Sequence, residues 1–260
     1  MNSSQVLHLM ISGIRSYARQ NGFKKAVIGL SGGIDSALTC SLAVQALGKK
    51  NVTVLLLPSP FTNPENMKDA KEICKNLGIA YKTYSIHRLL KSYLREIDFL
   101  SSEFSLAEEN LQARIRGNIL MSYSNKYHAL VLNTGNKSEA LTGYFTLYGD
   151  SCGGLAVLAN LYKTQVYEIS AQYNLKFGSG IPFSVFQKLP TAELRKNQSD
   201  EADLLPYPLL DSILKLYFDQ NKTVNQIVKK GFKKKDVEKV VRWVEKSKFK
   251  RKQLPPALNW

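Results

Sequence analysis

The chain has 260 residues, of which 44% are apolar and 22% charged, and its formal net charge is +15. This composition is typical of a globular protein and excludes a disordered tail protein or a fibrous repeat. The length suits one α/β domain over residues 1–260. No apolar run approaches the ~20 residues of a membrane span, and the opening MNSSQVLHLM lacks the basic and apolar regions of a signal peptide. We therefore expect a cytoplasmic protein with no membrane partner.

The first part of the chain alternates helical patterns with short apolar runs. Val6, Met10, Ile14, Tyr17 and Ala18 recur at helical spacing and predict an opening helix with one buried face. After it, the pattern predicts strands over 26–30, 52–57 and 81–86 and helices over 37–47 and 64–77.

The middle of the chain adds a long helix over 105–126 and a strand over 129–132. The inward-facing positions of this helix are expected to be Leu106, Leu111, Ile115 and Ile119. Strands that alternate with helices predict a single twisted parallel sheet with helices on both faces, a Rossmann-like α/β fold. The stretch 178–208 holds four of the nine prolines and little periodicity, so we expect a long loop there.

Positive charge is concentrated near the end of the chain. Residues 222–252 hold thirteen lysines and arginines against three acids, which gives +10 of the +15. Val237, Val240, Val241 and Val244 recur at helical spacing in this stretch and predict an amphipathic helix packed on a core. Nucleic acid is one possible partner, but a charge run is usually a solvated face. We expect a helical basic segment from about residue 222 and no bound nucleic acid.

The strongest chemical signal is the turn after the first strand, Ser31-Gly32-Gly33-Ile34-Asp35-Ser36. Adjacent glycines allow a tight turn with inward N–H groups, and the following helix adds the positive end of its dipole, so the turn suits a phosphate. Asp35 would repel phosphate unless a divalent cation bridges them, and Mg²⁺ takes one or two carboxylates plus phosphates. The turn is neither a P-loop nor a dinucleotide-binding G-x-G-x-x-G turn. A simple helix cap is the structural alternative.

The turn resembles the S-G-G-x-D-S pyrophosphate loop of the N-type ATP pyrophosphatases, which cleave ATP to AMP and pyrophosphate. Further motifs occur in the order seen in the NAD synthetases of that group, at residues 110–116, 134–139, 142–150, 161–165, 190–194 and 198–201. The resemblance covers nearly the whole chain and is closest to the ammonia-dependent bacterial members. It implies an adenine nucleotide alpha hydrolase type of fold and the amidation of deamido-NAD to NAD, through an adenylated intermediate, as the final step of NAD biosynthesis.

The resemblance also implies roles for individual residues. ATP would be bound by Gly29, Leu30, Ser31, Gly32, Gly33, Ile34, Asp35, Ser36, Thr134, Lys163 and Thr191. Mg²⁺ would be held by Asp35 and Glu139, and deamido-NAD by Arg114 and Lys250. Because the relatives are homodimers, a homodimer is expected here.

Each of these roles has a structural alternative. A helix-cap role would explain Asp35 or Glu139 singly, but it explains the pair less well. Arg114 could serve an interhelical salt bridge, and Thr191 could cap a helix. Lys163 begins a helix, where a cation opposes the dipole, and this favours a phosphate partner over an exposed lysine.

Asp150 and Lys163 are the catalytic candidates. Ammonia near neutral pH is mostly ammonium, so a carboxylate such as Asp150 would bind it and help remove a proton; capping a turn is the alternative role. One departure from the family pattern is Leu147, which replaces a lysine present in many relatives.

The nitrogen donor is predicted from the length. Glutamine-dependent relatives carry an additional amidase domain with a catalytic cysteine, and the glycine turn begins at Ser31 with no room upstream for such a domain. We therefore expect free ammonia as the direct donor, unless a separate amidase subunit supplies it.

Two other hypotheses remain. A tRNA-modifying ATP pyrophosphatase would keep the fold and bind RNA through the basic tail, but it predicts an RNA-binding appendage or catalytic cysteines. A basic nucleic-acid-binding protein would leave Asp35, Glu139 and the glycine turn without a purpose.

Overall fold

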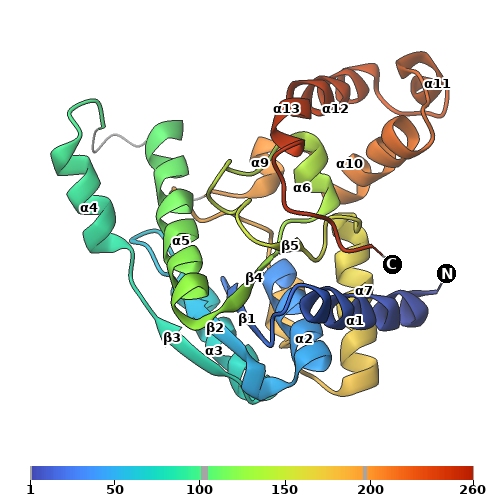
Figure 1. Ribbon diagram of the computed structural model, residues 1–260. Coiled ribbons are helices and arrows are strands. Elements are labelled where there is room, and N and C mark those ends of the chain that lie inside the picture. The colour runs from blue at the N-terminus through green and yellow to red at the C-terminus, as the bar shows by residue number, and fades with distance from the viewer. Residues whose placement is uncertain (1, 101–104, 196–197, 260) are drawn as a thin grey trace.

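The computed structural model describes residues 2–100, 105–195 and 198–259. Parallel strands form one sheet in the order β3-β2-β1-β4-β5 (Figure 1). The strands are β1 (Lys25–Gly29), β2 (Val52–Leu56), β3 (Ala80–Thr83), β4 (Ala129–Asn133) and β5 (Leu155–Ala156). The strand order reverses between β1 and β4. In parallel sheets, ligands bind beyond the carboxyl ends of strands at such a reversal.

Alternation along the strands gives the sheet two apolar faces. Ile28 and Val54 face a large cluster made with α1 (Ser3–Gln20), α2 (Ile34–Leu47), α3 (Pro64–Leu77) and α7 (Lys163–Phe177). Val27 and Val131 face a second cluster made with α4 (His87–Glu96) and α5 (Leu106–Tyr127), which lie on the opposite side of the sheet (Figure 1). The expected Rossmann-like parallel sheet with helices on both faces is confirmed.

Several local predictions differ from the structure. Leu106 was expected to face inward but is 71% exposed, because it is the first residue of α5 and lies beyond the edge of the sheet cluster. The two-residue strand β5 has no pattern of its own, and its pairing with β4 defines it. The expected long loop 178–208 contains α8 (Phe183–Gln187) and α9 (Asp200–Asp203), which are too short to produce visible periodicity.

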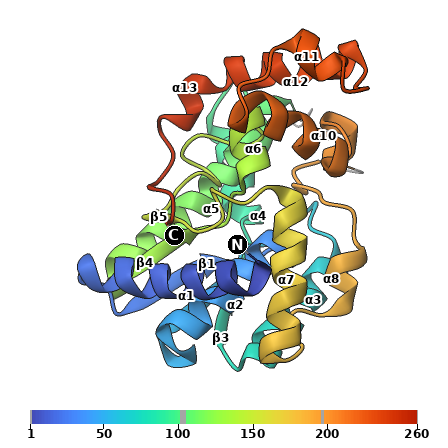
Figure 2. The same ribbon diagram turned by 90° about the vertical axis from the view of Figure 1, so that its right-hand side faces the viewer.

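The last part of the chain forms a separate helical layer, drawn in orange and red at the top of Figures 1 and 2. It consists of α10 (Tyr207–Leu214), η2 (Lys215–Asp219), α11 (Val224–Val228), α12 (Lys234–Lys246) and α13 (Lys248–Arg251), and it packs on α6 (Lys137–Thr142). Val237, Val240 and Val244 are buried in its own apolar cluster, so the basic side chains of α12 lie on the opposite, solvated face. The remaining short helix is η1 (Lys49–Asn51).

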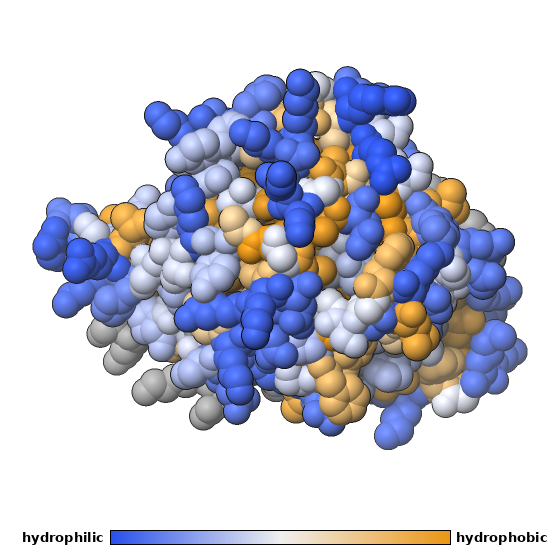
Figure 3. Space-filling view, turned by 90° about the horizontal axis from the view of Figure 1, so that it is seen from below, coloured by the Kyte–Doolittle hydropathy of each residue, from blue (hydrophilic) through white to orange (hydrophobic). Residues whose placement is uncertain are grey.

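The outer surface is mainly polar. The face in Figure 3 is largely hydrophilic, with hydrophobic residues in narrow streaks between charged side chains. Among the described helices, none combines the length and apolar character needed to cross a membrane.

Candidate active site

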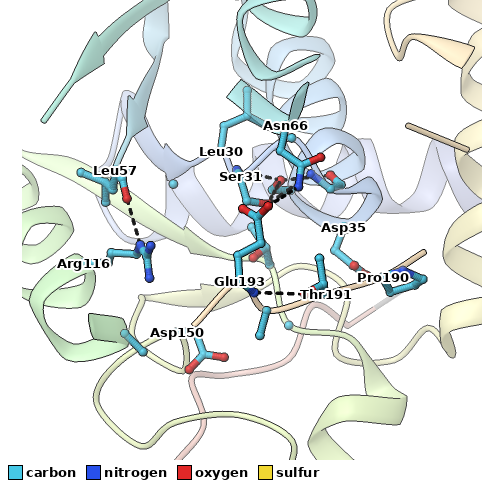
Figure 4. Close-up of a pocket in the computed structure, with 18 of the residues that line it drawn as sticks. Leu30, Ser31, Asp35, Leu57, Asn66, Arg116, Asp150, Pro190, Thr191 and Glu193 are labelled. Atoms are coloured by element: carbon cyan, nitrogen blue, oxygen red, sulfur yellow. Dashed lines mark hydrogen bonds between the residues drawn. The ribbon is translucent and has the colours of Figure 1, made fainter. Parts of the chain in front are cut away.

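A pocket opens at the carboxyl ends of β1 and β4, where the strand order reverses. It is lined by the turn after β1 (residues 29–36), by residues 133–135 and Glu139 after β4, and by the segment 188–194. Figure 4 shows Ser31 and Asp35 of the first turn together with Thr191 and Glu193 of that segment. These segments are far apart in the sequence, and the parallel sheet brings them together because both strands end at the same edge.

Glycine is required in the first turn at one position. Gly32 has φ +90°, and a Cβ atom there would lie 2.2 Å from the backbone oxygen of Asn66 on α3. The turn is also tied internally, because the Ser36 hydroxyl donates to Gly33 O (3.1 Å) and Ser31 N donates to Ser36 Oγ (3.2 Å). Gly33 is the N-cap of α2 and supplies no side chain, so the helix N-terminus stays open to the pocket.

The two turns are joined by Asp35, Asn136, Glu139 and Lys163. Asn136 Nδ2 donates to Asp35 Oδ1 at 2.9 Å, and Lys163 Nζ donates to Asp35 Oδ2. The same Nζ lies 3.9 Å from Glu139 Oε1. Lys163 is the first residue of α7, and its backbone N–H donates to the buried Ser138 hydroxyl at 3.0 Å, which fixes the start of that helix against α6. The predicted metal pair and the predicted phosphate lysine therefore meet at one point.

Burial perturbs the titration of this cluster. The pKa of Glu139 is raised well above its usual value, first by burial and then by the Asp35 charge. Burial by itself would lower the pKa of Lys163, but the negative charges of Asp35 and Glu139 have the larger combined effect and raise it. Lys163 therefore stays protonated. Its single positive charge does not balance the negative charges that the carboxyl groups around it carry when ionised.

The charge balance of this cluster fits a divalent cation. Asp35, Glu139 and the nearby Asp200 carry three negative charges when ionised, and Lys163 supplies one positive charge. The missing two charges are those of Mg²⁺, which is satisfied by one or two protein carboxylates when phosphates complete its shell. The described residues contain no group of three or more acidic, histidine or cysteine ligands arranged for a metal, so Asp35 and Glu139 would supply two ligands and water or phosphate oxygens the rest.

Thr134, which follows β4, and Thr191, in the segment 188–194, line the same pocket. Thr191 was considered as a helix cap, but no helix follows it; its hydroxyl accepts from Glu193 N (3.2 Å) in a turn. Glu193 has φ +51° and extends into the pocket, where Oε1 accepts from Asn66 Nδ2 at 2.7 Å and Asn63 N at 2.9 Å (Figure 4). The segment is thereby fastened to α3.

Asp150 lines the pocket beneath this segment (Figure 4). Its Oδ1 accepts from Thr146 N at 2.7 Å, and Asn133 at the end of β4 holds its backbone oxygen at 2.6 Å. The carboxylate is accessible from the pocket but closely surrounded by protein, and this desolvation raises its pKa against the opposing charges of Lys250 and Arg116.

Arg116 is a pocket residue that the sequence did not single out. Its Nε donates to Leu57 O at 2.9 Å, and burial lowers its pKa to about 10 despite the charges of Glu193 and Asp150. Glu193, Asp200 and Lys188 were missed as well. Arg116, Glu193 and Asp200 lie within the recognised motifs. The sequence around each of them does not show whether its side chain faces a pocket, caps a helix or lies on the surface.

Arg114 and Lys250 lie outside the lining of this pocket. Both instead hold the 143–148 segment: Arg114 Nε donates to Leu147 O (3.2 Å), and Lys250 Nζ donates to Gly143 O (2.6 Å) and Phe145 O. Arg114 is exposed rather than part of a helix–helix ion pair. The structure thus brings the remaining predicted residues into one pocket and leaves this pair on a neighbouring surface.

The parallel sheet and the pocket at its reversal define a Rossmann-like α/β protein. A family model described as NAD synthase matches residues 6–254, so the chain belongs to the NAD synthase family. The glutamine-dependent NAD(+) synthetase of Thermotoga maritima is 48% identical over 256 residues, covering 97% of this chain and 44% of that protein. The corresponding protein of Aquifex aeolicus is 46% identical and is covered to 43%. The chain spans a little under half the length of these curated relatives.

Solved structures agree with this placement. The NMN synthetase from Francisella tularensis is similar with a TM-score of 0.82 and 30% identity, covering 96% of each chain. The NH3-dependent NAD synthetase from Campylobacter jejuni is similar with a TM-score of 0.78 and 27% identity over the whole of both chains.

Proposed function

We propose that this protein catalyses the ATP-dependent amidation of deamido-NAD to NAD, with release of AMP and pyrophosphate. The observation that carries the proposal is the convergence of the glycine turn, Asp35, Glu139 and Lys163 at the strand-order reversal in a member of the NAD synthase family. Phosphate groups, a divalent cation and a charged lysine are what an AMP-forming ligase must assemble at one place.

Each part of the pocket has a task in this proposal. The N–H groups of residues 32–36 at the start of α2 hold the ATP phosphates, assisted by Lys163, Thr134 and Thr191. Asp35 and Glu139 hold Mg²⁺, which when bound neutralises phosphate charge. Arg114 and Lys250 contact deamido-NAD on the neighbouring surface, which extends the substrate site beyond the pocket.

The chemistry proceeds in two displacements. The nicotinate carboxylate attacks the α-phosphorus of ATP, and pyrophosphate leaves with the bonding electrons. Ammonia then attacks the carbonyl carbon of the acyl adenylate, the bond from that carbon to the phosphate oxygen breaks, AMP leaves with the bonding electrons, and the nitrogen releases a proton to solvent to give the amide. Asp150 accepts the proton that ammonium must lose before it can attack, and its raised pKa brings it nearer to working pH.

Ammonia is the proposed nitrogen donor of this chain. Hydrolysis of glutamine by a cysteine needs an accessible thiolate. Cys40 and Cys74 are buried, and burial raises the pKa of the pocket residue Cys152 to about 11. The curated relatives are named glutamine-dependent, so the assay described below compares ammonium with glutamine as the nitrogen source.

A mononucleotide acceptor is the second candidate, favoured by the likeness to the NMN synthetase. The acceptor would then be nicotinate mononucleotide, with the same carboxylate and the same chemistry. A homodimer remains our expectation, and it is tested by sedimentation.

One assay separates these possibilities. The purified protein is given ATP and Mg²⁺ with ammonium or glutamine, and with deamido-NAD, nicotinate mononucleotide or neither acceptor. We expect AMP and NAD in equal amounts with ammonium and deamido-NAD. Release of ADP, or AMP formation that does not depend on an acceptor, contradicts the proposal, and amidation of the mononucleotide alone favours the second candidate. Turnover with glutamine equal to that with ammonium contradicts the donor assignment.

Asp35→Ala tests the pocket assignment. Loss of the carboxylate should lower kcat by about 10²-fold or more, with the fold intact by circular dichroism because Glu139 remains to pair with Lys163. Activity near that of the unsubstituted protein removes Asp35 from the metal site.

A further inference from the structure

Asp200 is a buried pocket residue, and one of its carboxyl oxygens accepts no close hydrogen bond from the described residues. The residue is 4% exposed, and Oδ2 accepts from the Tyr207 hydroxyl at 2.9 Å. Oδ1 has no hydrogen-bond partner among the described residues. The nearby Tyr144 hydroxyl donates to Asp203 at 2.9 Å and also interacts with the Asp200 carboxyl group from beyond normal hydrogen-bond distance. Burial raises the pKa of Asp200, and a buried carboxyl oxygen without a close hydrogen-bond partner is costly and needs an explanation.

Lys163 is the cation best placed to supply that partner. Its ammonium has three donors, yet it makes one close ion pair, with Asp35, and lies 3.9 Å from Glu139. The negative charge of Asp200 already acts on it. The Tyr207 ring lies 5.2 Å from Nζ, so one tyrosine contacts both the lysine and Asp200.

The ammonium of Lys163 also lies against both carboxylates that are proposed to hold a metal. Asp35 and Glu139 are the two proposed Mg²⁺ ligands, and Lys163 Nζ sits against both. A divalent cation and an ammonium cannot share the same carboxylate oxygens without strong repulsion. Binding of the metal therefore requires Lys163 to leave Asp35 and to find another counter-charge in the pocket.

We propose that Asp200 is a positioning residue that receives the ammonium of Lys163 when a divalent cation binds Asp35 and Glu139. This inference rests on the proposed metal pair of the preceding section. It gives the free oxygen of Asp200 a purpose, and it keeps Lys163 in the pocket, where its charge faces the phosphates after the metal has bound. Asp200 acts on the metal only through the lysine.

A double-mutant cycle on metal binding tests this relation without nucleotide or turnover. Mn²⁺ is titrated against the full chain, and free Mn²⁺ is followed by electron paramagnetic resonance. Lys163→Met should tighten Mn²⁺ binding about tenfold or more, because it removes the competing cation. Asp200→Asn should weaken binding by a similar factor in the parent protein, and it should have little effect in the Lys163→Met background.

Three results would overturn the proposal. Equal weakening by Asp200→Asn in both backgrounds would make Asp200 a direct metal ligand. No change in either background, with only a lower melting temperature, would leave Asp200 a structural partner of Tyr207. Equal tightening by Lys188→Met would reduce the Lys163 effect to general charge, since Lys188 lines the same pocket but pairs with Asp69.

Two further measurements keep the cycle interpretable. Tyr207→Phe removes the hydroxyl and leaves the Asp200 carboxylate, so Mn²⁺ affinity should respond to Asp200→Asn far more than to this variant; the reverse order contradicts the proposal. The product assay is run separately. Failure to form NAD with an intact Mn²⁺ cycle overturns the proposed reaction alone, whereas NAD formation with a flat cycle overturns the Asp200 relation alone.

Discussion

The side chain of Asn136 links the two turns of the pocket. Nδ2 donates to Asp35 Oδ1 at 2.9 Å, while Oδ1 accepts from Glu139 N at 3.0 Å as the N-cap of α6. One amide therefore caps a helix after β4 and holds a carboxylate that follows β1. Because Asn136 is fully buried, both contacts are shielded from water.

Replacement of Asn136 should cost more than the loss of a cap. Asn136→Ala removes the cap, worth about 1 kcal/mol, and leaves Asp35 without one of its buried donors, worth a further ~1–3 kcal/mol. We expect a combined loss of about 2–4 kcal/mol in urea unfolding. Asn63→Ala is the matched control, because Asn63 Oδ1 caps α3 by accepting from Glu65 N and its side chain makes no contact with Asp35. Equal losses in the two variants would show that the link to Asp35 contributes nothing.

Alanine substitution of the two glycines in the turn should have unequal effects on the free energy of unfolding. Gly32→Ala places a Cβ atom 2.2 Å from Asn66 O at φ +90°, so we expect a loss of stability of about 2 kcal/mol or more. Gly33 has φ −85°, and the nearest atom to its Cβ would be Ser31 Oγ at 3.4 Å. Gly33→Ala should therefore change the unfolding free energy by less than ~1 kcal/mol. A reversed order of the two losses contradicts this account of the turn.

Glu139 should make the ligand-free protein less stable as the pH rises. Burial raises the pKa of Glu139 well above that of a glutamate in the unfolded chain, so the folded state keeps the proton at pH values where the unfolded chain has lost it. Stability contributed by this group is present below the unfolded pKa and is lost as the pH rises toward the folded one, at ~1.4 kcal/mol for each unit of difference. Glu139→Gln removes this loss and keeps the acceptor for Asn136 N.

The measurement is urea unfolding between pH 4 and pH 8 without metal or nucleotide. Glu139→Gln should match the parent protein at the acid end and become more stable than it toward pH 8. Glu65→Gln, an exposed position in the first turn of α3, provides the control and should give no widening difference. A constant difference across the range for Glu139→Gln would contradict the raised pKa.

Asp150 should control how the rate depends on pH. Its pKa is raised by burial, so the carboxylate that is proposed to accept a proton from ammonium is lost progressively as the pH falls through that pKa. Asp150→Asn keeps an acceptor for Thr146 N but no base. We expect a higher KM for ammonium and a rate that rises about tenfold per pH unit, in proportion to free ammonia. An unchanged pH profile would make Asp150 a turn cap.

The sequence by itself determined the sheet, the glycine turn and the nature of the basic tail. Hydrophobic periodicity is local, so the four longer strands and the face of α1 that bears Met10 and Ile14 could be predicted from neighbouring residues. The glycine turn could be recognised in the sequence because its glycines and polar residues interrupt an apolar strand and an apolar helix. The strand β5 could not be predicted from the sequence, because only its pairing with β4 defines it as a strand.

Only the tertiary structure shows which charged and polar side chains contact one another. Lys163 is 128 residues from Asp35, and Glu193 is 127 residues from Asn66, so no local pattern relates either pair. Asp200 resembles a helix-start residue in the sequence, and only packing shows that it is buried with a free oxygen beside Tyr207. Burial strengthens charge interactions and shifts pKa values, and burial is a property of the assembled pocket. The chemistry of the site therefore depends on contacts that the order of residues does not display.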